Sequence, residues 1–103
     1  MTLTTDISRT LLEVTGEPRA EIAIYGLLKD AIEHRIEKID AGLKKLEDKY
    51  HMPFSEFSDR FHKNEIPNAY GYEIESDFLD WEGLNSRMAK YQSLLPAFPD
   101  DRL

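Results

Sequence analysis

Residues 25–50, YGLLKDAIEHRIEKIDAGLKKLEDKY, carry an apolar stripe that keeps helical spacing for roughly seven turns at about 3.6 residues per turn. Its members follow one another at steps of three or four residues: Tyr25, Leu28, Ile32, Ile36, Ile39, Leu43, Leu46 and Tyr50. Such a stripe lies on one side of a helix and must be buried against another apolar surface. The pattern predicts an all-α fold built on a long helix over residues 18–51.

A second stripe near the C-terminus has the same spacing and comprises Phe78, Trp81, Leu84, Met88, Tyr91 and Leu95. It predicts a last helix over residues 76–95, with Ser76 as N-cap and Pro96 as its stop. One antiparallel register pairs the two stripes in five layers: Leu46–Trp81, Leu43–Leu84, Ile39–Met88, Ile36–Tyr91 and Ile32–Leu95. We therefore expect an antiparallel helical hairpin.

The segment between these two helices predicts a bridge across the closed end of the hairpin. Pro53 ends the long helix and opens a short helix over residues 53–63, in which Phe54, Phe57 and Phe61 share one face. Residues 64–75 form a connection, and the alternation of Tyr70, Tyr72 and Ile74 favours a short extended piece within it.

The N-terminal segment, residues 1–17, permits two interpretations. Ile7, Leu11 and Val14 have helical spacing with Asp6 as a candidate cap, whereas the Thr and Val content also suits a strand. We prefer the helix, ended by Gly16 and followed by Pro18 in the first turn of the long helix. Residues 96–103 complete the chain as a tail.

The size and charge of the chain predict a single helical domain, residues 1–103, that associates with a partner. Its 103 residues are 41% hydrophobic and 32% charged, with a net charge of -7. A domain this small buries only about 60 to 65% of its unfolded surface. Apolar residues surround the first turns of the long helix, where Gly26 permits close approach. We therefore predict a homodimer interface at Ile22, Ile24, Tyr25, Leu27 and Leu28, which would make the assembly a dimeric helical bundle.

The acidic residues are concentrated in one stretch of the sequence. No base occurs between Lys63 and Arg87, while six acids do. Within residues 70–82 the acids alternate with aromatic residues, a composition typical of an interface that attracts a basic partner. Phe78 and Trp81 also belong to the predicted hairpin core. The predicted partner-binding residues are Tyr70, Tyr72, Glu73, Glu75, Asp77, Asp80 and Glu82.

The remaining residues favour neither catalysis nor a cofactor. The chain has no cysteine, no glycine-rich phosphate loop and no serine, histidine and acid that can be placed together. Asp30, Glu33, His34 and Glu37 lie within two helical turns, but their order is the reverse of a di-iron Glu-x-x-His motif. We interpret them as a solvated face, without metal, and His51 as a helix-end residue.

Nucleic-acid binding and membrane insertion are also disfavoured. Lys38, Lys44, Lys45 and Lys49 could contact phosphate, but the chain is acidic and lacks a helix-turn-helix pattern. The N-terminus MTLTTDIS has no signal-peptide character, and no run approaches the roughly 20 apolar residues that span a membrane. We expect a cytoplasmic protein.

Three segments resemble a family of small prokaryotic helical proteins: TLLEVTGE (10–17), KKLEDKYHMPFSEFSDRF (44–61) and ESDFLDWEGLNSRMAKYQSLL (75–95). The shared features are a Tyr-x-Met-x-Phe-x-x-Phe turn, which begins here at Tyr50, and a Trp-Glu-Gly-Leu block, which begins at Trp81. Members of this family resemble antitoxins because they are encoded beside small toxin-like proteins. The resemblance implies an acidic protein that neutralises a basic, ribonuclease-type toxin.

Two other functions remain open at this point. One is a structural or scaffolding oligomer without a toxin partner. The other is an operator-binding regulator, although the chain has neither the DNA-binding domain nor the disordered tail that many antitoxins combine.

Overall fold

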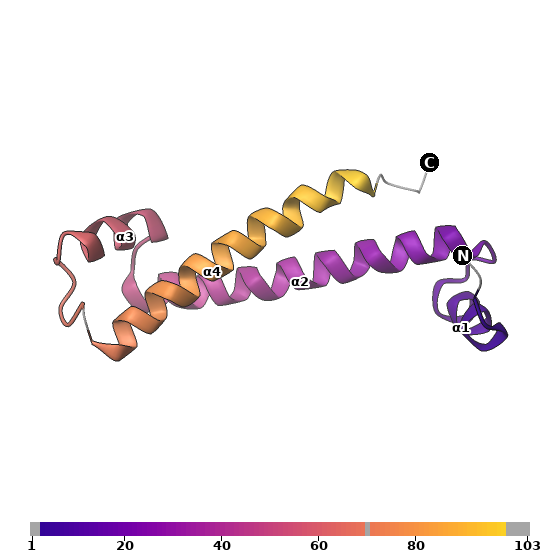
Figure 1. The fold of residues 1–103 in the computed structure, drawn as a ribbon, viewed down its shortest axis with the longest axis horizontal. Coiled ribbons are helices and arrows are strands. Elements are labelled where there is room, and N and C mark those ends of the chain that lie inside the picture. The colour runs from indigo at the N-terminus through magenta and orange to yellow at the C-terminus, as the bar shows by residue number, and fades with distance from the viewer. Residues whose placement is uncertain (1–2, 70, 99–103) are drawn as a thin grey trace.

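The structure is a computed structural model that describes residues 3–69 and 71–98, and every regular element in those two ranges is a helix. The elements are α1 (Thr5–Thr15), α2 (Ala20–Tyr50), α3 (Phe54–His62), α4 (Tyr72–Leu94) and the 3-10 turn η1 (Leu95–Ala97). The prediction of an all-α fold is confirmed. Figure 1 shows α2 as the long axis of the molecule, with α4 running back beside it, α3 at one end and α1 at the other.

The N-terminal segment is helical because it docks on α2. Leu11 is the buried residue of α1, and this tertiary contact decides between the helix and strand interpretations. Thr4 replaces the expected Asp6 as N-cap, and its Oγ1 accepts a hydrogen bond from the Ile7 N–H at 3.2 Å. Gly16 ends the helix in the left-handed region with φ 70°, where a side chain would be strained.

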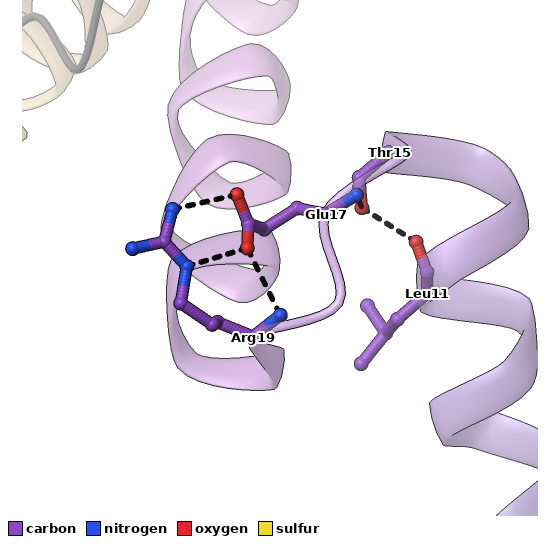
Figure 2. A network of polar contacts seen from close by, with 4 residues as sticks. All are labelled: Leu11, Thr15, Glu17 and Arg19. Carbon is purple, nitrogen blue, oxygen red and sulfur yellow. Dashed lines mark hydrogen bonds and ion pairs between the residues drawn. The ribbon is translucent and has the colours of Figure 1, made fainter.

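The linker between α1 and α2 explains why the long helix begins later than predicted. The Glu17 carboxylate accepts hydrogen bonds from the Arg19 backbone N–H at 3.0 Å and from its guanidinium at 2.6 and 2.9 Å (Figure 2). Arg19 is thereby held in an extended conformation as N-cap. Pro18 consequently precedes α2 instead of forming its first turn.

The main core lies at the end of the molecule where α2, α3 and α4 meet. Phe57 and Trp81 have relative exposures of 0% and 1%, and Ile66 and Ala69 from the connecting loop complete the buried cluster. The sequence analysis did not identify these two loop residues as core. Partly buried side chains surround the cluster: Leu43, Leu46, Tyr50, Met52, Phe54, Phe61, Ile74 and Phe78.

Aromatic residues make up half of this core. The rings of Phe57 and Trp81 lie 5.1 Å apart between centroids, and those of Phe61 and Phe78 stack at 4.5 Å. Phe54, Phe57 and Phe61 all point to α4, as their spacing predicted. Aromatic pairs of this kind contribute about 0.5 to 1.5 kcal/mol each beyond the area that they bury.

The last helix starts four residues earlier than predicted. Its N-cap is Gly71, with φ -72° and ψ 151°, so that Ser76 lies in the second turn. The expected extended piece is therefore wrong for Tyr72 and Ile74, which are helical, while Tyr70 lies outside the described residues. Glu73 and Glu75 stabilise the new first turn because carboxylates interact favourably with the positive end of a helix dipole.

Contacts between α2 and the C-terminal part of the chain occur along the molecule. Tyr50 stacks on Trp81 at 6.0 Å, a side-chain carbon at Gly42 would lie 3.2 Å from Leu84 Cδ1, and Tyr25 meets Phe98 edge-on at 5.6 Å. The full five-layer register and the dimeric bundle stay predictions. The molecule is extended, at 58 × 28 × 22 Å.

Candidate protein-interaction surfaces

The outer face of α4 presents two large hydrophobic side chains to solvent. Tyr72 is 88% exposed and Leu79 is 64% exposed. They lie seven residues apart, two turns along the same side of the helix, because the buried Trp81 fixes the opposite side towards the core. Glu75 and Glu82 repeat the same seven-residue spacing beside them and are exposed. We call these four residues, Tyr72, Glu75, Leu79 and Glu82, the acidic strip.

Two other acids of α4, the exposed Glu73 and the half-buried Asp77, lie beside the last turn of α2. The Lys49 ammonium donates to Glu73 Oε1 at 2.6 Å and to Asp77 Oδ2 at 2.5 Å. The Tyr50 hydroxyl donates a short hydrogen bond to the same Asp77 oxygen. This network joins the end of α2 to the beginning of α4, where helix dipoles favour a cation and carboxylates respectively.

The network shifts the pKa values of its members. Burial and then the hydrogen bond to Asp77 raise the pKa of Tyr50 to about 12. Partial burial alone would raise the pKa of Asp77, but the hydrogen bonds from Lys49 and Tyr50 outweigh it and lower that pKa below its ordinary value. The pKa of Lys49 is raised by its hydrogen bonds to Asp77 and Glu73. Asp77 is therefore ionised and satisfied within the chain at neutral pH.

The structure thus divides the predicted partner-binding residues into two groups. Tyr72, Glu75, Asp80 and Glu82 are exposed on α4, whereas Glu73 and Asp77 bond to Lys49. Tyr70 lies outside the described residues. Leu79 was not among the predicted binding residues, although its separation of seven residues from Tyr72 and its absence from the core stripe could have identified it.

A second apolar surface lies at the other end of the molecule, around the beginning of α2. Among the predicted dimer residues, Tyr25 and Leu28 are 59% and 49% exposed. The other three, Ile22, Ile24 and Leu27, are half-buried. The helix α1 covers part of this region, since Ala23 is only 2% exposed.

The predicted register pairs the stripe of α2 with α4 only as far as Ile32, so it gives the first turns of α2 no apolar partner. The structure adds Phe98, whose ring contacts Tyr25. It also places an open apolar groove between α1 and α2, lined chiefly by Ile7, Leu11, Val14 and Leu27. Ile7 and Val14 remain 52% and 65% exposed, so α1 docks without completing a core.

A family model, the uncharacterized protein MJ0235 family, matches residues 1–98. The chain belongs to this family. Neither the curated proteins nor the solved structures yielded a match. The match includes the residues of both surfaces, and it names no antitoxin.

Two further features of this MJ0235 family member concern metals and membranes. Across residues 3–69 and 71–98, no three histidine, cysteine, aspartate or glutamate side chains are grouped so that they could hold a metal ion. The members of the candidate set at Asp30, Glu33, His34 and Glu37 are each exposed on α2. No helix in the described part of the chain has the length and apolar character that crossing a membrane requires.

Proposed function

We propose that the protein binds a basic partner protein through the acidic strip of α4. The observation that carries the proposal is the row formed by Tyr72, Glu75, Leu79 and Glu82 on one side of α4. In this row two exposed hydrophobic side chains lie beside two exposed acids that repeat the same seven-residue spacing. Exposed aromatic anchors supply affinity at protein interfaces, and flanking charge steers an oppositely charged partner.

The charge around the strip favours a basic partner. The sequence from Asn64 to Ser86 contains six acids and no base. Lys49 offsets part of the charge of Glu73 and Asp77, whereas Glu75 and Glu82 have no cation in the set of ion pairs formed by the described residues. The negative potential is therefore concentrated along the strip, where it attracts lysine and arginine side chains.

The proposal takes α2 and α4 as an antiparallel hairpin in the predicted register. In that arrangement Trp81, Leu84 and Met88 face α2, and the opposite side of α4 is left for the partner. Asp80 flanks the strip on its other side and would form part of the rim. We further propose a cytoplasmic protein without catalytic activity, whose function is binding.

The specific form of the proposal is an antitoxin, with a basic toxin as the partner. It is supported by the resemblance of the Tyr50 turn and the Trp81 block to antitoxin-like proteins. The test is co-expression with the product of the neighbouring gene, followed by purification and titration calorimetry at low and physiological salt. A complex at micromolar concentration is expected, and absence of a complex would contradict the antitoxin form.

The strip itself is tested by paired charge reversals. Glu75→Lys with Glu82→Lys should weaken the complex at least about tenfold and reduce its salt dependence, because both acids flank the anchors. The matched control, Glu33→Lys with Glu37→Lys on the exposed side of α2, changes net charge equally. Equal weakening by the two pairs would show that only overall charge matters.

A structural oligomer without a basic partner is the second candidate function. The exposed Tyr25 and Leu28 favour it, because they provide a surface for association that lies outside the acidic strip. The two functions are distinguished by the charge reversals, since loss of the acidic strip would leave a purely structural oligomer assembled.

A further inference from the structure

The apolar stripe of α2 loses its cover towards the N-terminus of that helix. Along one side, relative exposure is 7% at Ile39 and 9% at Ile32, but it rises to 49% at Leu28 and 59% at Tyr25. These residues have the same helical spacing and the same apolar character. The stripe therefore continues beyond its buried part.

Exposed hydrophobic side chains are concentrated at this end of the molecule. Eight large ones are exposed among the described residues, and the acidic strip accounts for two. The other six belong to α1, the first turns of α2 and the last turn of α4: Ile7, Leu12, Val14, Tyr25, Leu28 and Leu94. Single exposed hydrophobics are ordinary, whereas several at one end of a molecule provide apolar surface for an interaction site.

The total exposed area is larger than that of a compact chain of the same mass. The chain exposes 7723 Å², whereas a compact monomer of 12.0 kDa exposes about 6,000 Å². The excess of about 1,700 Å² exceeds the roughly 800 Å² that each partner loses in a standard interface. The radius of gyration of 19.7 Å, against about 13 Å for a compact 100-residue domain, agrees with this.

The charge pattern decides between a second copy and the basic partner at this surface. Residues 17–38 contain five acids and four bases, so two such surfaces can meet without strong repulsion. Residues 64–86 contain six acids and no base, and two copies of the acidic strip would repel each other. The N-terminal part of α2 therefore fits a second copy of the same chain.

We propose that a second copy of the chain packs on the exposed end of the α2 stripe, with Tyr25 and Leu28 at the centre of a two-fold interface. In such an interface a residue near the axis meets its own counterpart. The surface differs from the acidic strip, so the dimer would present two strips, one on each protomer, for basic partners. The dimer does not depend on the proposed function.

Cysteine cross-linking tests this proposal directly, because the chain contains no cysteine. Leu28→Cys is expected to form a covalent dimer under mild oxidation, since counterparts near a two-fold axis approach within disulfide range. The matched control is Leu79→Cys, which is more exposed but lies on the acidic strip. Equal cross-linking of both variants, or none at Leu28→Cys, would overturn the proposal.

Molar mass provides the second measurement. Light scattering of the unmodified chain at micromolar concentration should give twice the 12.0 kDa of one chain. Leu28→Glu should reduce the mass to that of a monomer while the helical circular dichroism is retained, and Leu79→Glu should not. A monomeric unmodified chain, or a dimeric Leu28→Glu variant, would contradict the interface.

Discussion

The two ends of α2 bury their side chains to very different degrees. At the closed end, where α3 and α4 meet α2, Phe57 and Trp81 are fully enclosed and an ion-pair network joins α2 to α4. At the open end, where α1 meets α2, Leu11 and Ala23 are the buried residues within the described ranges, and Tyr25 and Leu28 are exposed. Both ends have apolar sequences, so composition alone does not distinguish them.

The closed end therefore carries its own core, whereas the open end buries few side chains and leaves the surface that the proposed dimer would cover. Phe57 and Trp81 are the largest fully buried side chains of the described residues, and the rings of Tyr50, Phe54 and Phe61 surround them. The open end orders eleven residues of α1 and buries one of them. Ordering a residue costs about 1 to 2 kcal/mol in backbone entropy, so this end is the less stable one.

The largest effect is expected at the centre of the closed end. Trp81→Ala should lower the free energy of unfolding by about 3 to 5 kcal/mol, because it leaves a cavity among the phenylalanine rings. Urea denaturation followed by circular dichroism measures this loss. The control is Val14→Ala on α1, which is 65% exposed and should change stability by less than about 0.5 kcal/mol. Comparable losses would remove the distinction between the two ends.

Removal of the one buried side chain of α1 should have a smaller and more local effect. Leu11→Ala should cost about 2 kcal/mol, the low end for such a truncation, because the groove beside Leu11 is already open. Hydrogen exchange should show lost protection in α1 while the amides of α3 keep theirs. Uniform loss of protection would mean that both ends unfold as a single unit.

Much of this contrast could be predicted from the sequence, because periodicity reports which side of a helix is apolar. The stripes ending in Tyr50 and containing Trp81 identified the two long helices, and the three phenylalanines identified α3. The burial of Ile66 and Ala69 could not be predicted, since a loop has no period that marks its inward side. Helix starts depended on side-chain contacts such as that of Glu17 with Arg19, which composition does not reveal.

The position of the candidate site in the sequence could also be predicted, but the contacts of its individual acids could not. The base-free stretch located the acidic segment of α4 correctly, because charge is read directly from residue types. The prediction took every acid of residues 73–82 as a binding residue, because composition does not show which of them have partners within the chain. The bonds of Asp77 to Lys49 and Tyr50 join residues far apart in the sequence, so they could not be predicted.

The polar network of Lys49, Tyr50 and Asp77 at the closed end should make a pH-dependent contribution to the free energy of unfolding. Tyr50→Phe keeps the ring packing but removes the hydroxyl, and Asp77 retains Lys49, so the loss should be about 1 kcal/mol at neutral pH. Tyr50 has a raised pKa of about 12, so its contribution is full below the unfolded value near 10.0 and is lost as pH rises towards 12. Denaturation of the variant should therefore show a flatter decline between these pH values.

Lowering the pH tests the same network through protonation of Asp77. The pKa of Asp77 is lowered in the folded chain, so its contribution is present above the unfolded value of 3.8 and is lost as pH falls through the folded pKa. Asp77→Asn should remove that acid-dependent part of the stability. Glu75→Gln, on the exposed strip, is the control. If the stability of Asp77→Asn fell at low pH as much as that of the unmodified chain, the proposed role of the network would be contradicted.

The smallest effects are expected from replacing one glycine in each half of α2 by alanine. Alanine in place of glycine stabilises a helix interior by up to about 1 kcal/mol. At Gly26, in the open half of α2, an added carbon meets no atom within 4 Å, so the full gain is expected. At Gly42 it would lie 3.2 Å from Leu84 Cδ1, which must shift and reduces the gain. Thermal unfolding of Gly26→Ala and Gly42→Ala measures this difference. A loss of dimer mass in Gly26→Ala would place the second copy on the side of α2 that carries Gly26, opposite to the exposed end of the stripe.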